Sequence, residues 1–212
     1  MTETATSDVA REPRRGRPRG TYAKTEARRQ EILKAAFEVF STAGYRAGSI
    51  QDIADKIGLT KTGLLHHFPS KEALLEAVLT LRDEDSWAGA GIVTDNGMET
   101  LNGIVRLVHN NTTVPGLVAL HCVLSAESTD PTHPAHEYFQ RRYNWVREVG
   151  GQAFSDLDRR GKLRQGITPG AAARQLVALM DGLQVQWLLD NDSVDMAGEL
   201  KSFLGSITTE KF

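Results

Sequence analysis

The sequence predicts an all-α protein with an N-terminal three-helix domain of helix-turn-helix type and a larger C-terminal helical domain. Apolar residues recur at three- and four-residue spacing along most of the 212-residue chain, and no alternating, strand-like pattern persists. Clusters of glycine and proline divide the chain into segments of helical length. Residues 52–67, DIADKIGLTKTGLLHH, place one glycine between two short apolar-patterned pieces, as in a helix-turn-helix unit.

Composition limits the kinds of protein that the chain can be. Its 40% hydrophobic and 25% charged residues are ordinary for a globular protein. Cys122 is the single cysteine, so no intramolecular disulfide can form, and a small buried side chain is favoured over a redox sensor. The N-terminus lacks an apolar signal segment, and no apolar run approaches the roughly 18 residues that span a bilayer. We therefore expect a cytoplasmic protein without a membrane partner.

The net charge of −2 conceals two oppositely charged parts. From Arg11 to Lys71 there are 13 Lys and Arg against 6 Asp and Glu, whereas from Glu72 to Phe212 there are 12 against 19. A basic front favours a polyanionic partner at that end of the chain. Chance clustering of charges on solvated helix faces is the alternative, and charge alone does not separate the two.

Cap residues set the expected bounds of the helix-turn-helix unit. Ser49 and Asp52 form a variant of the capping box at the start of its first helix. Gly58 ends that helix and permits the turn, and Thr60 can cap the second helix. Ahead of the unit, a longer amphipathic helix begins near residue 24 and ends where Gly44 fits a left-handed position.

The histidines do not form a convincing catalytic or metal site. His66 and His67 are adjacent, so on a helix they point about 100° apart and cannot bind one metal from the same face. His133, His136 and Glu137 have a weak metal-binding spacing, for which a polar helix entry beside a loop is the favoured interpretation. No catalytic triad, glycine-rich phosphate loop or CxxC motif is recognisable. We therefore expect no enzymatic activity, no cofactor and no metal site.

The second helix of the unit has the composition of a DNA-recognition helix. Leu64 can anchor it to the core, which leaves Lys61, Thr62, Gly63 and His66 facing outward. Small side chains let a helix enter the major groove, where lysine and threonine can meet base edges. This pattern favours a protein that reads DNA.

The front of the chain also resembles a known family. Residues 35–75 read AAFEVFSTAGYRAGSIQDIADKIGLTKTGLLHHFPSKEALL and are similar to the N-terminal domain of TetR-family transcriptional regulators. The resemblance covers about residues 25–75, and the segment DGLQVQWLLD, residues 181–190, is a weaker match to the last two helices of family members. It implies a DNA-binding front, a ligand-binding rear domain and a homodimer.

The resemblance extends the expected DNA contacts. His67 matches a histidine that often precedes an aromatic residue, and Lys71 matches a common phosphate-contacting lysine. Leu65 departs from the family, because many relatives have a tyrosine there, and His66 is a candidate to replace its phosphate contact. The expected DNA-binding residues are Arg17, Ser49, Gln51, Thr60, Lys61, Thr62, Gly63, Leu65, His66, His67 and Lys71.

Residues 1–23 are expected to be a disordered basic arm, because they hold almost no large apolar side chains. The segment around Arg17, RRGRPRG, is similar to the core of an AT-hook, which lays arginine into a narrow minor groove. A solvated tail that only raises the rate of encounter with DNA is the alternative.

The remaining residues are expected to form two domains, a helix-turn-helix DNA-binding domain at 24–71 and a ligand-binding and dimerisation domain at 72–212. Rear helices are expected at about 98–112, 116–128, 134–160, 169–190 and 195–208, after a connection at Trp87–Gly97. The helix at 169–190 is apolar on two sides, and the helix at 195–208 carries a strong apolar stripe. Both features indicate a twofold homodimer through residues 169–208, with coverage of both faces inside the monomer as the alternative.

The resemblance also implies an effector pocket among the rear helices. Its expected lining residues are Val105, His109, His121, Tyr143, Met180, Asp181 and Gln184. Asp181 is the most informative, because a carboxylate among apolar residues needs a partner, which His109, His121 or a cationic ligand group can supply. A place at the subunit interface or at another helix cap is the alternative for Asp181.

These observations predict a ligand-responsive, sequence-specific DNA-binding transcriptional regulator. Its simplest form is a homodimeric repressor that a small-molecule effector releases from a pseudo-palindromic operator in double-stranded DNA. The alternatives are an architectural DNA-binding protein without a ligand and a helical enzyme with a coincidental helical hairpin. The rear domain is larger than dimerisation requires, which argues against the first, and the lack of a convergent catalytic set argues against the second.

Overall fold

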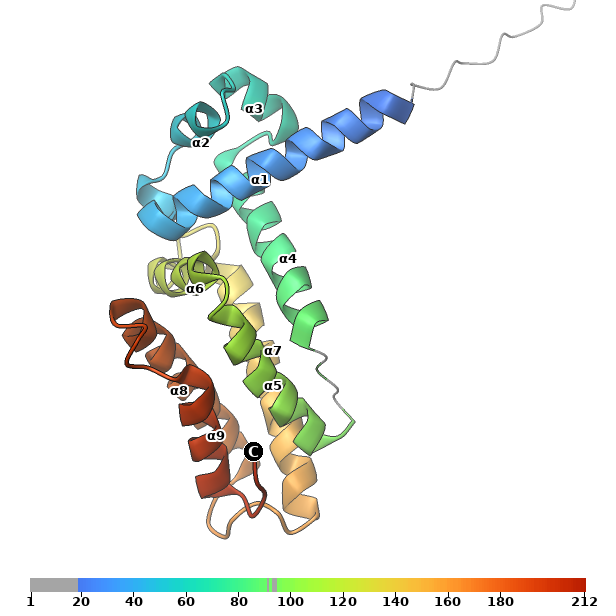
Figure 1. Ribbon diagram of the computed structural model, residues 1–212, viewed down its shortest axis with the longest axis vertical. Coiled ribbons are helices and arrows are strands. Elements are labelled where there is room, and N and C mark those ends of the chain that lie inside the picture. Colours follow the sequence, from blue (N-terminus) through green and yellow to red (C-terminus); the bar gives the residue numbers. More distant parts are fainter. Residues whose placement is uncertain (1–18, 91, 93–94) are drawn as a thin grey trace, which may run out of the picture.

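The computed structural model describes residues 19–90, 92 and 95–212. This part of the chain contains nine α-helices and one isolated β-bridge, between Leu163 and Thr208, so the predicted all-α class is confirmed. Figure 1 shows α1, α2 and α3 at one end of an elongated molecule and α5, α7, α8 and α9 at the other end. The fourth helix, α4, runs from the first group towards the second.

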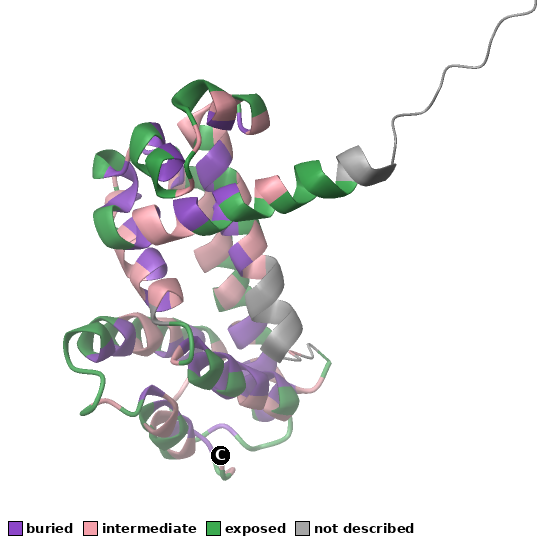
Figure 2. Ribbon diagram, turned by 45° about the horizontal axis from the view of Figure 1, so that its top comes forward, coloured by how far each residue is buried: buried purple, intermediate pink, exposed green. Residues whose placement is uncertain are grey.

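The first helix, α1 (Arg19–Ala47), is longer than predicted. It begins at Arg19 and not near Lys24, and residues 1–18 lie outside the described part. The disordered arm expected at 1–23 stays a prediction. Extending a helix that is already nucleated costs little, and an apolar face is therefore not needed in its first turns. Figure 2 shows α1 projecting from the body, with mostly exposed residues over 23–30. Gly44 has φ 73°, which confirms its left-handed conformation, and the chain turns helical again up to Ala47.

The helix-turn-helix unit consists of α2 (Ile50–Lys56) and α3 (Lys61–His67), as predicted. Ser49 and Asp52 form a reciprocal capping box, and Thr60 Oγ1 accepts a hydrogen bond from the Gly63 N–H at 3.0 Å. Gly58, with φ 65°, ends α2, and the Leu59 N–H donates back to the Ala54 carbonyl at 2.9 Å. This bond closes a Schellman turn that fixes the direction of α3.

The fourth helix, α4 (Lys71–Ala90), connects the two ends of the molecule. Leu74, Leu75, Val78 and Leu79 are buried with α1, α2 and α3 in an N-terminal core. The predicted connection at 87–97 is wrong in its first part, because α4 continues to Ala90. Alanine is the strongest helix former, so the sequence WAGA does not stop a helix as a glycine-rich loop would. The predicted domain boundary at 71/72 falls at the first residue of α4 and stays a prediction.

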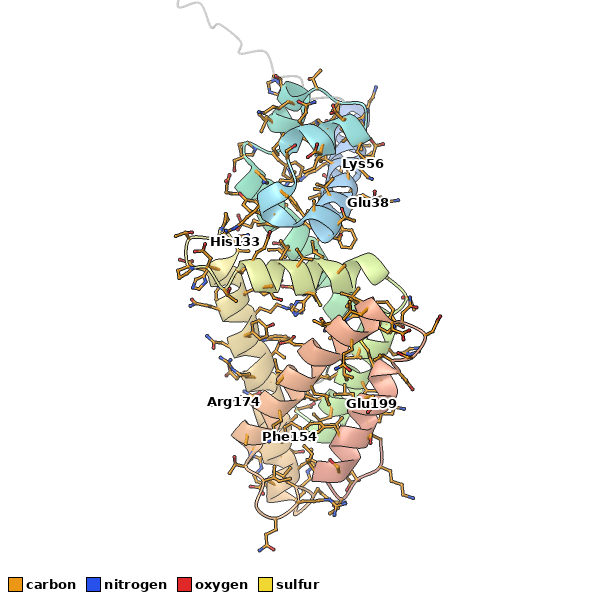
Figure 3. All side chains as sticks on the ribbon, turned by 90° about the vertical axis from the view of Figure 1, so that its left-hand side faces the viewer. Glu38, Lys56, His133, Phe154, Arg174 and Glu199 are labelled. Carbon is orange, nitrogen blue, oxygen red and sulfur yellow. The ribbon has the colours of Figure 1, made fainter. Side chains whose placement is uncertain are left out.

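The C-terminal part contains α5 (Gly97–Asn111), α6 (Pro115–Glu127), α7 (His136–Arg159), α8 (Pro169–Leu189) and α9 (Met196–Ile207). Their bounds agree with the predicted ranges to within about one helical turn. A second core joins α5, α7, α8 and α9 around Phe154, Leu176 and Leu200. Figure 3 shows α6 lying across the molecule between this group and the N-terminal helices, and α6 packs against α1.

Candidate DNA interface and effector cavity

The third helix presents a short polar face to solvent. Leu64 is fully buried and holds α3 against the N-terminal core, as predicted. Lys61, Thr62 and His66 are exposed, and Gly63 lies between them on the outer side with partial exposure. This face combines two hydrogen-bonding side chains, one cation and a position without a side chain, which is the composition that a helix needs to approach base edges closely.

The residues that flank α3 are held by local contacts. Leu65 packs against the N-terminal core, and the His67 carbonyl accepts a hydrogen bond from Arg29 Nη1 at 3.1 Å. Lys71 Nζ lies 4.3 Å from the centre of the Tyr45 ring, and partial burial lowers the pKa of its ammonium. The Gln51 amide donates to Asp55 Oδ1 at 2.6 Å. These side chains surround the face of α3 and do not extend it.

Ser49 and Arg17, two of the predicted DNA-contacting residues, are not part of the exposed face of α3. The Ser49 hydroxyl donates to Asp52 Oδ2 at 2.6 Å and also accepts from the Asp52 N–H at 3.1 Å. Its hydrogen-bonding capacity is therefore used by the cap of α2. Arg17 lies outside the described residues, so its minor-groove contact stays a prediction.

A small cavity of about 40 Å³ lies in the C-terminal part, where α4, α5, α6, α7 and α8 meet. It is lined by Arg82, Leu107, Asn111, His121, Arg142, Tyr143, Val146, Val177, Met180, Asp181 and Gln184. Ligand pockets for drug-sized molecules usually measure about 300–1,000 Å³. The cavity in this conformation therefore accommodates a few atoms and must widen to take a larger molecule.

Five of the seven predicted pocket residues line this cavity, namely His121, Tyr143, Met180, Asp181 and Gln184. Val105 and His109 do not line it: Val105 is buried in the C-terminal core and His109 is exposed. The reason is the rotation of α5. Residues two positions apart on a helix point about 200° apart, so α5 turns Leu107 and Asn111 to the cavity instead.

Arg82 also lines the cavity, although it is not among the residues predicted from the sequence. Of the lining residues that were not predicted, it matters most for the charge of the cavity. It is only 6% exposed, although arginine is rarely buried without a partner. The sequence contains a signal, because Arg82 continues the stripe of Leu75 and Val78 at helical spacing. A charge at the end of a buried stripe indicates a functional position or a buried ion pair.

Asp181 has two neutral hydrogen-bond donors on neighbouring helices. His121 Nε2 lies 3.3 Å from Asp181 Oδ1, and the Tyr143 hydroxyl donates to Asp181 Oδ2 at 2.9 Å. Burial lowers the pKa of His121 to about 4, against the opposing effect of the Asp181 hydrogen bond, so the imidazole is neutral at pH 7. A neutral ring that donates through Nε2 carries its lone pair on Nδ1, and this buried atom has no partner among the described residues.

Cys122 adjoins the same group of side chains. Its Sγ lies 3.9 Å from Gln184 Oε1, and burial raises the pKa of the thiol to about 11. The sulfur is therefore a thiol at neutral pH and a poor nucleophile.

The wall of the cavity formed by α4 and α7 carries more cations than anions. Arg142 Nη1 forms an ion pair with Asp83 Oδ1, and Arg82 Nη1 lies 3.5 Å from the same oxygen. The Tyr138 hydroxyl donates to Asp83 Oδ2 at 2.6 Å. Burial, and then the charge of Arg142, lower the pKa of Arg82 to about 10, so the guanidinium stays charged at neutral pH. Its buried Nε has no hydrogen-bond partner among the described residues.

The two ends of the molecule meet at the carboxylate of Glu127, the last residue of α6. It accepts hydrogen bonds from the backbone N–H groups of Tyr45 and Arg46, at 2.8 Å and 3.4 Å, just after the turn at Gly44. His133, labelled in Figure 3 beside the α6–α7 loop, is buried with its Nε2 3.5 Å from the Glu127 carboxylate. This contact joins the end of α1, just before the helix-turn-helix unit, to α6.

The histidines of the weak metal pattern have structural partners. The Ala135 N–H donates to His133 Nδ1 at 3.1 Å, and His136 Nδ1 lies 2.7 Å from the Ser128 carbonyl oxygen. Among the described residues, no group of three or more His, Cys, Asp or Glu side chains has the arrangement of a metal site. In the same part of the chain, no helix is long and apolar enough to cross a membrane.

The exposed α3, its helix-turn-helix geometry and the helical C-terminal part define the class, a DNA-binding regulator of helix-turn-helix type. The family model for bacterial regulatory proteins of the tetR family matches residues 32–78, and the model for the C-terminal domain of BetI-type transcriptional repressors matches residues 119–204. The chain belongs to the TetR family of transcriptional regulators, as the sequence predicted.

Relatives along almost the whole chain support this assignment. The transcriptional regulator UidR of Escherichia coli is 28% identical over 198 residues, which are 88% of this chain and 96% of UidR. The crystal structure of NalD from Pseudomonas aeruginosa, a secondary repressor of a multidrug efflux pump, superposes with a TM-score of 0.67 and 25% identity, covering 87% of this chain and 98% of NalD. A regulator from Saccharomonospora viridis in complex with choline shares the fold, with a TM-score of 0.69, 23% identity and coverage of 86% and 98%. UidR and NalD are named as a transcriptional regulator and as a repressor.

Proposed function

We propose that the chain is a homodimeric repressor that binds a pseudo-palindromic operator and leaves it when a small-molecule effector enters the C-terminal cavity. The observation that carries this proposal is the position of α4. Its first half is buried in the core that holds α3, and its second half brings Arg82 to the cavity wall. One rigid helix therefore touches both the DNA-reading unit and the effector site, and the chromosome on which such a repressor acts lies in the cytoplasm.

The exposed face of α3 is proposed to read the major groove. Lys61, Thr62 and His66 are the candidates for base-edge and phosphate contacts, and Gly63 allows close approach of the helix backbone. The surrounding residues are proposed to contact the DNA backbone or to orient α3, and the predicted set of these is Arg17, Ser49, Gln51, Thr60, Leu65, His67 and Lys71. In this set Ser49 and Thr60 act first as helix caps.

The dimer is proposed to form through the outer face of α8, with α9 alongside. The apolar stripe of α9 is used inside the monomer, because Met196, Leu200 and Leu204 are buried. On α8, by contrast, Val185 is 49% exposed and Leu189 is 83% exposed. An exposed apolar patch at the end of a long helix favours an isologous contact with the same patch of a second copy.

Release from DNA is proposed to follow from the size of the cavity. At about 40 Å³ it has no room for an effector-sized molecule in this conformation. An effector therefore binds a wider state better than the compact one, and this difference in affinity is what shifts the population. Widening between α4, α7 and α8 moves α4, and the Glu127 contact passes part of that movement to the helix before α2.

Two variant pairs test the DNA-binding and dimer parts of the proposal. Lys61→Ala is expected to weaken operator binding and to reduce its salt dependence by about 0.9 in log–log slope, if Lys61 contacts one phosphate. Lys211→Ala, an exposed lysine near the C-terminus, is the matched control and is expected to bind as the wild type does. An unchanged affinity and slope for Lys61→Ala would remove α3 from the interface.

For the dimer, Val185→Glu is expected to shift sedimentation from dimer to monomer at micromolar concentration. Val114→Glu is its control, because Val114 is 46% exposed but lies in the loop before α6. A monomeric wild type, or a Val185→Glu variant that remains a dimer, contradicts the proposed interface.

A further inference from the structure

The effector cavity has an unusual feature on its α4 side, a buried arginine whose hydrogen bonds are incomplete. Arg82 is 6% exposed, and its Nε has no partner among the described residues. A guanidinium group carries five N–H donors, and a buried donor without an acceptor destabilises the folded state, more so when the group is charged. The C-terminal core therefore keeps a cation that the folded chain does not fully satisfy.

The nearby carboxylate cannot supply what Arg82 lacks. Asp83 Oδ1 receives Arg142 Nη1 and lies 3.5 Å from Arg82 Nη1, while Asp83 Oδ2 accepts from the Tyr138 hydroxyl at 2.6 Å. Asp83 is thus in contact with both guanidinium groups. This group of three ionised side chains carries a net charge of +1 next to a cavity that both arginines line.

A second carboxylate, that of Asp181 on α8, lines the same cavity and has hydrogen-bond donors of its own. Asp181 already accepts from Tyr143 and His121, and the unpartnered His121 Nδ1 can accept one further hydrogen bond. The cavity is also lined by apolar side chains, among them Val177 and Met180. A ligand that matches this lining has an anionic end towards the two arginines and an apolar body.

We propose that the effector is an organic acid whose carboxylate binds Arg82 and Arg142. A carboxylate offers two acceptors to the planar guanidinium fork, and its single charge balances the net charge of +1. A phosphate ester brings close to two negative charges into the same space, and a cation meets the two guanidinium groups of Arg82 and Arg142. The assignment rests on the proposed effector-controlled function and adds the chemical class of the effector.

The test compares acids with uncharged analogues of the same shape. Hexanoate and benzoate are titrated into the full-length protein by calorimetry, beside hexanamide, benzamide and choline. Both acids are expected to bind at least tenfold more tightly than their amides and than choline. Equal or tighter binding of the amides or of choline overturns the proposal, and so does the absence of binding by both acids at 10 mM, roughly 10-fold above the weakest ordinary affinities.

Substitutions separate the arginine from general features of the cavity. Arg82→Met is expected to lose at least tenfold in benzoate affinity, and Arg82→Lys, which keeps the charge but loses the fork, is expected to fall between Arg82→Met and the wild type. Arg159→Met, an exposed arginine of α7, is the control and is expected to behave as the wild type. Circular dichroism of each variant establishes that it is folded, and wild-type benzoate affinity in a folded Arg82→Met variant overturns the proposal.

The failure of this inference is distinguishable from failure of the proposed function. DNA binding is measured in parallel without any compound and with each compound. If an amide or choline releases the protein from DNA, the repressor stands and the organic-acid class is wrong. If a bound acid leaves DNA affinity unchanged, the acid site stands and effector-controlled release is wrong.

Discussion

Acidification is predicted to destabilise the protein through His121, a side chain that lines the C-terminal cavity. The groups that face it are Asp181 on α8, Tyr143 and Arg142 on α7, and Arg82 on α4. Burial lowers the pKa of His121 to about 4, whereas a histidine in an unfolded chain titrates near 6.5. Between about pH 4 and pH 6.5, His121 is therefore mostly protonated in the unfolded state and mostly neutral in the folded state.

The sign and size of the effect follow from this difference. The stability contributed by the neutral imidazole is present above pH 6.5 and is lost as the pH falls towards 4. Between pH 7 and pH 5 the unfolded chain gains most of one proton at this position and the folded chain gains little, so the free energy of unfolding falls by about 2 kcal/mol. Urea denaturation followed by circular dichroism at the two pH values, at one protein concentration, measures this loss.

Variants assign the loss to one residue. His121→Asn is expected to lower stability at both pH values but to reduce the difference between them by about 2 kcal/mol per protomer. His109→Asn removes an exposed histidine of α5 and is expected to keep the wild-type difference. If His121→Asn retains the full difference, His121 does not titrate as its burial requires, and the description of a neutral hydrogen-bonded imidazole in the cavity is refuted.

Three further substitutions test the Glu127 contact, the turn at Gly44 and the cap of α3 by chemical denaturation. Glu127→Ala leaves two backbone N–H groups without their acceptor and is expected to cost about 1–3 kcal/mol, whereas Glu137→Ala, on the exposed surface, is expected to cost less than about 0.5 kcal/mol. Gly44→Ala is expected to lower the free energy of unfolding more than Gly58→Ala does. Both glycines have positive φ, which costs another residue about 1–2 kcal/mol. Only at Gly44 would the added Cβ also come as close as 2.5 Å to another side chain, that of Glu127. Equal costs would contradict the close contact at Gly44. Thr60→Ala removes the cap of α3 and is expected to cost about 1 kcal/mol and to weaken operator binding in an anisotropy titration; unchanged values of both would show that the cap is not needed.

Features that depend on a few neighbouring residues were predictable from the sequence. The capping box at Ser49, the cap at Thr60 and the left-handed glycines at 44 and 58 are local, because each depends on side chains and backbone groups within one turn. The buried Leu64 followed from its spacing in α3. These residues fix the recognition unit, which explains why the front of the chain was predictable in detail.

The C-terminal cavity was less predictable because it depends on how distant helices rotate against one another. The choice of Val105 and His109 over Leu107 and Asn111 is a choice between two sides of α5, and it is decided by packing against α6, α7 and α8. Arg82 reaches the cavity only because α4 continues from the N-terminal core into the C-terminal part. Helix ends also shifted, because the sequences near Arg19 and Ala90 permit a helix without requiring one.

The central claim, that this TetR-family chain is an effector-controlled repressor, is tested most directly by fluorescence anisotropy. The purified wild-type protein is titrated onto labelled DNA from directly upstream of its own gene and onto unrelated DNA, over a range of salt concentrations, with and without benzoate. The account predicts saturable binding of two protomers per site, about 10³-fold or more preference for the upstream DNA, and release when the effector is added. Weak binding that is equal on both DNAs, collapses with salt and ignores every effector would contradict the account and favour an architectural DNA-binding role.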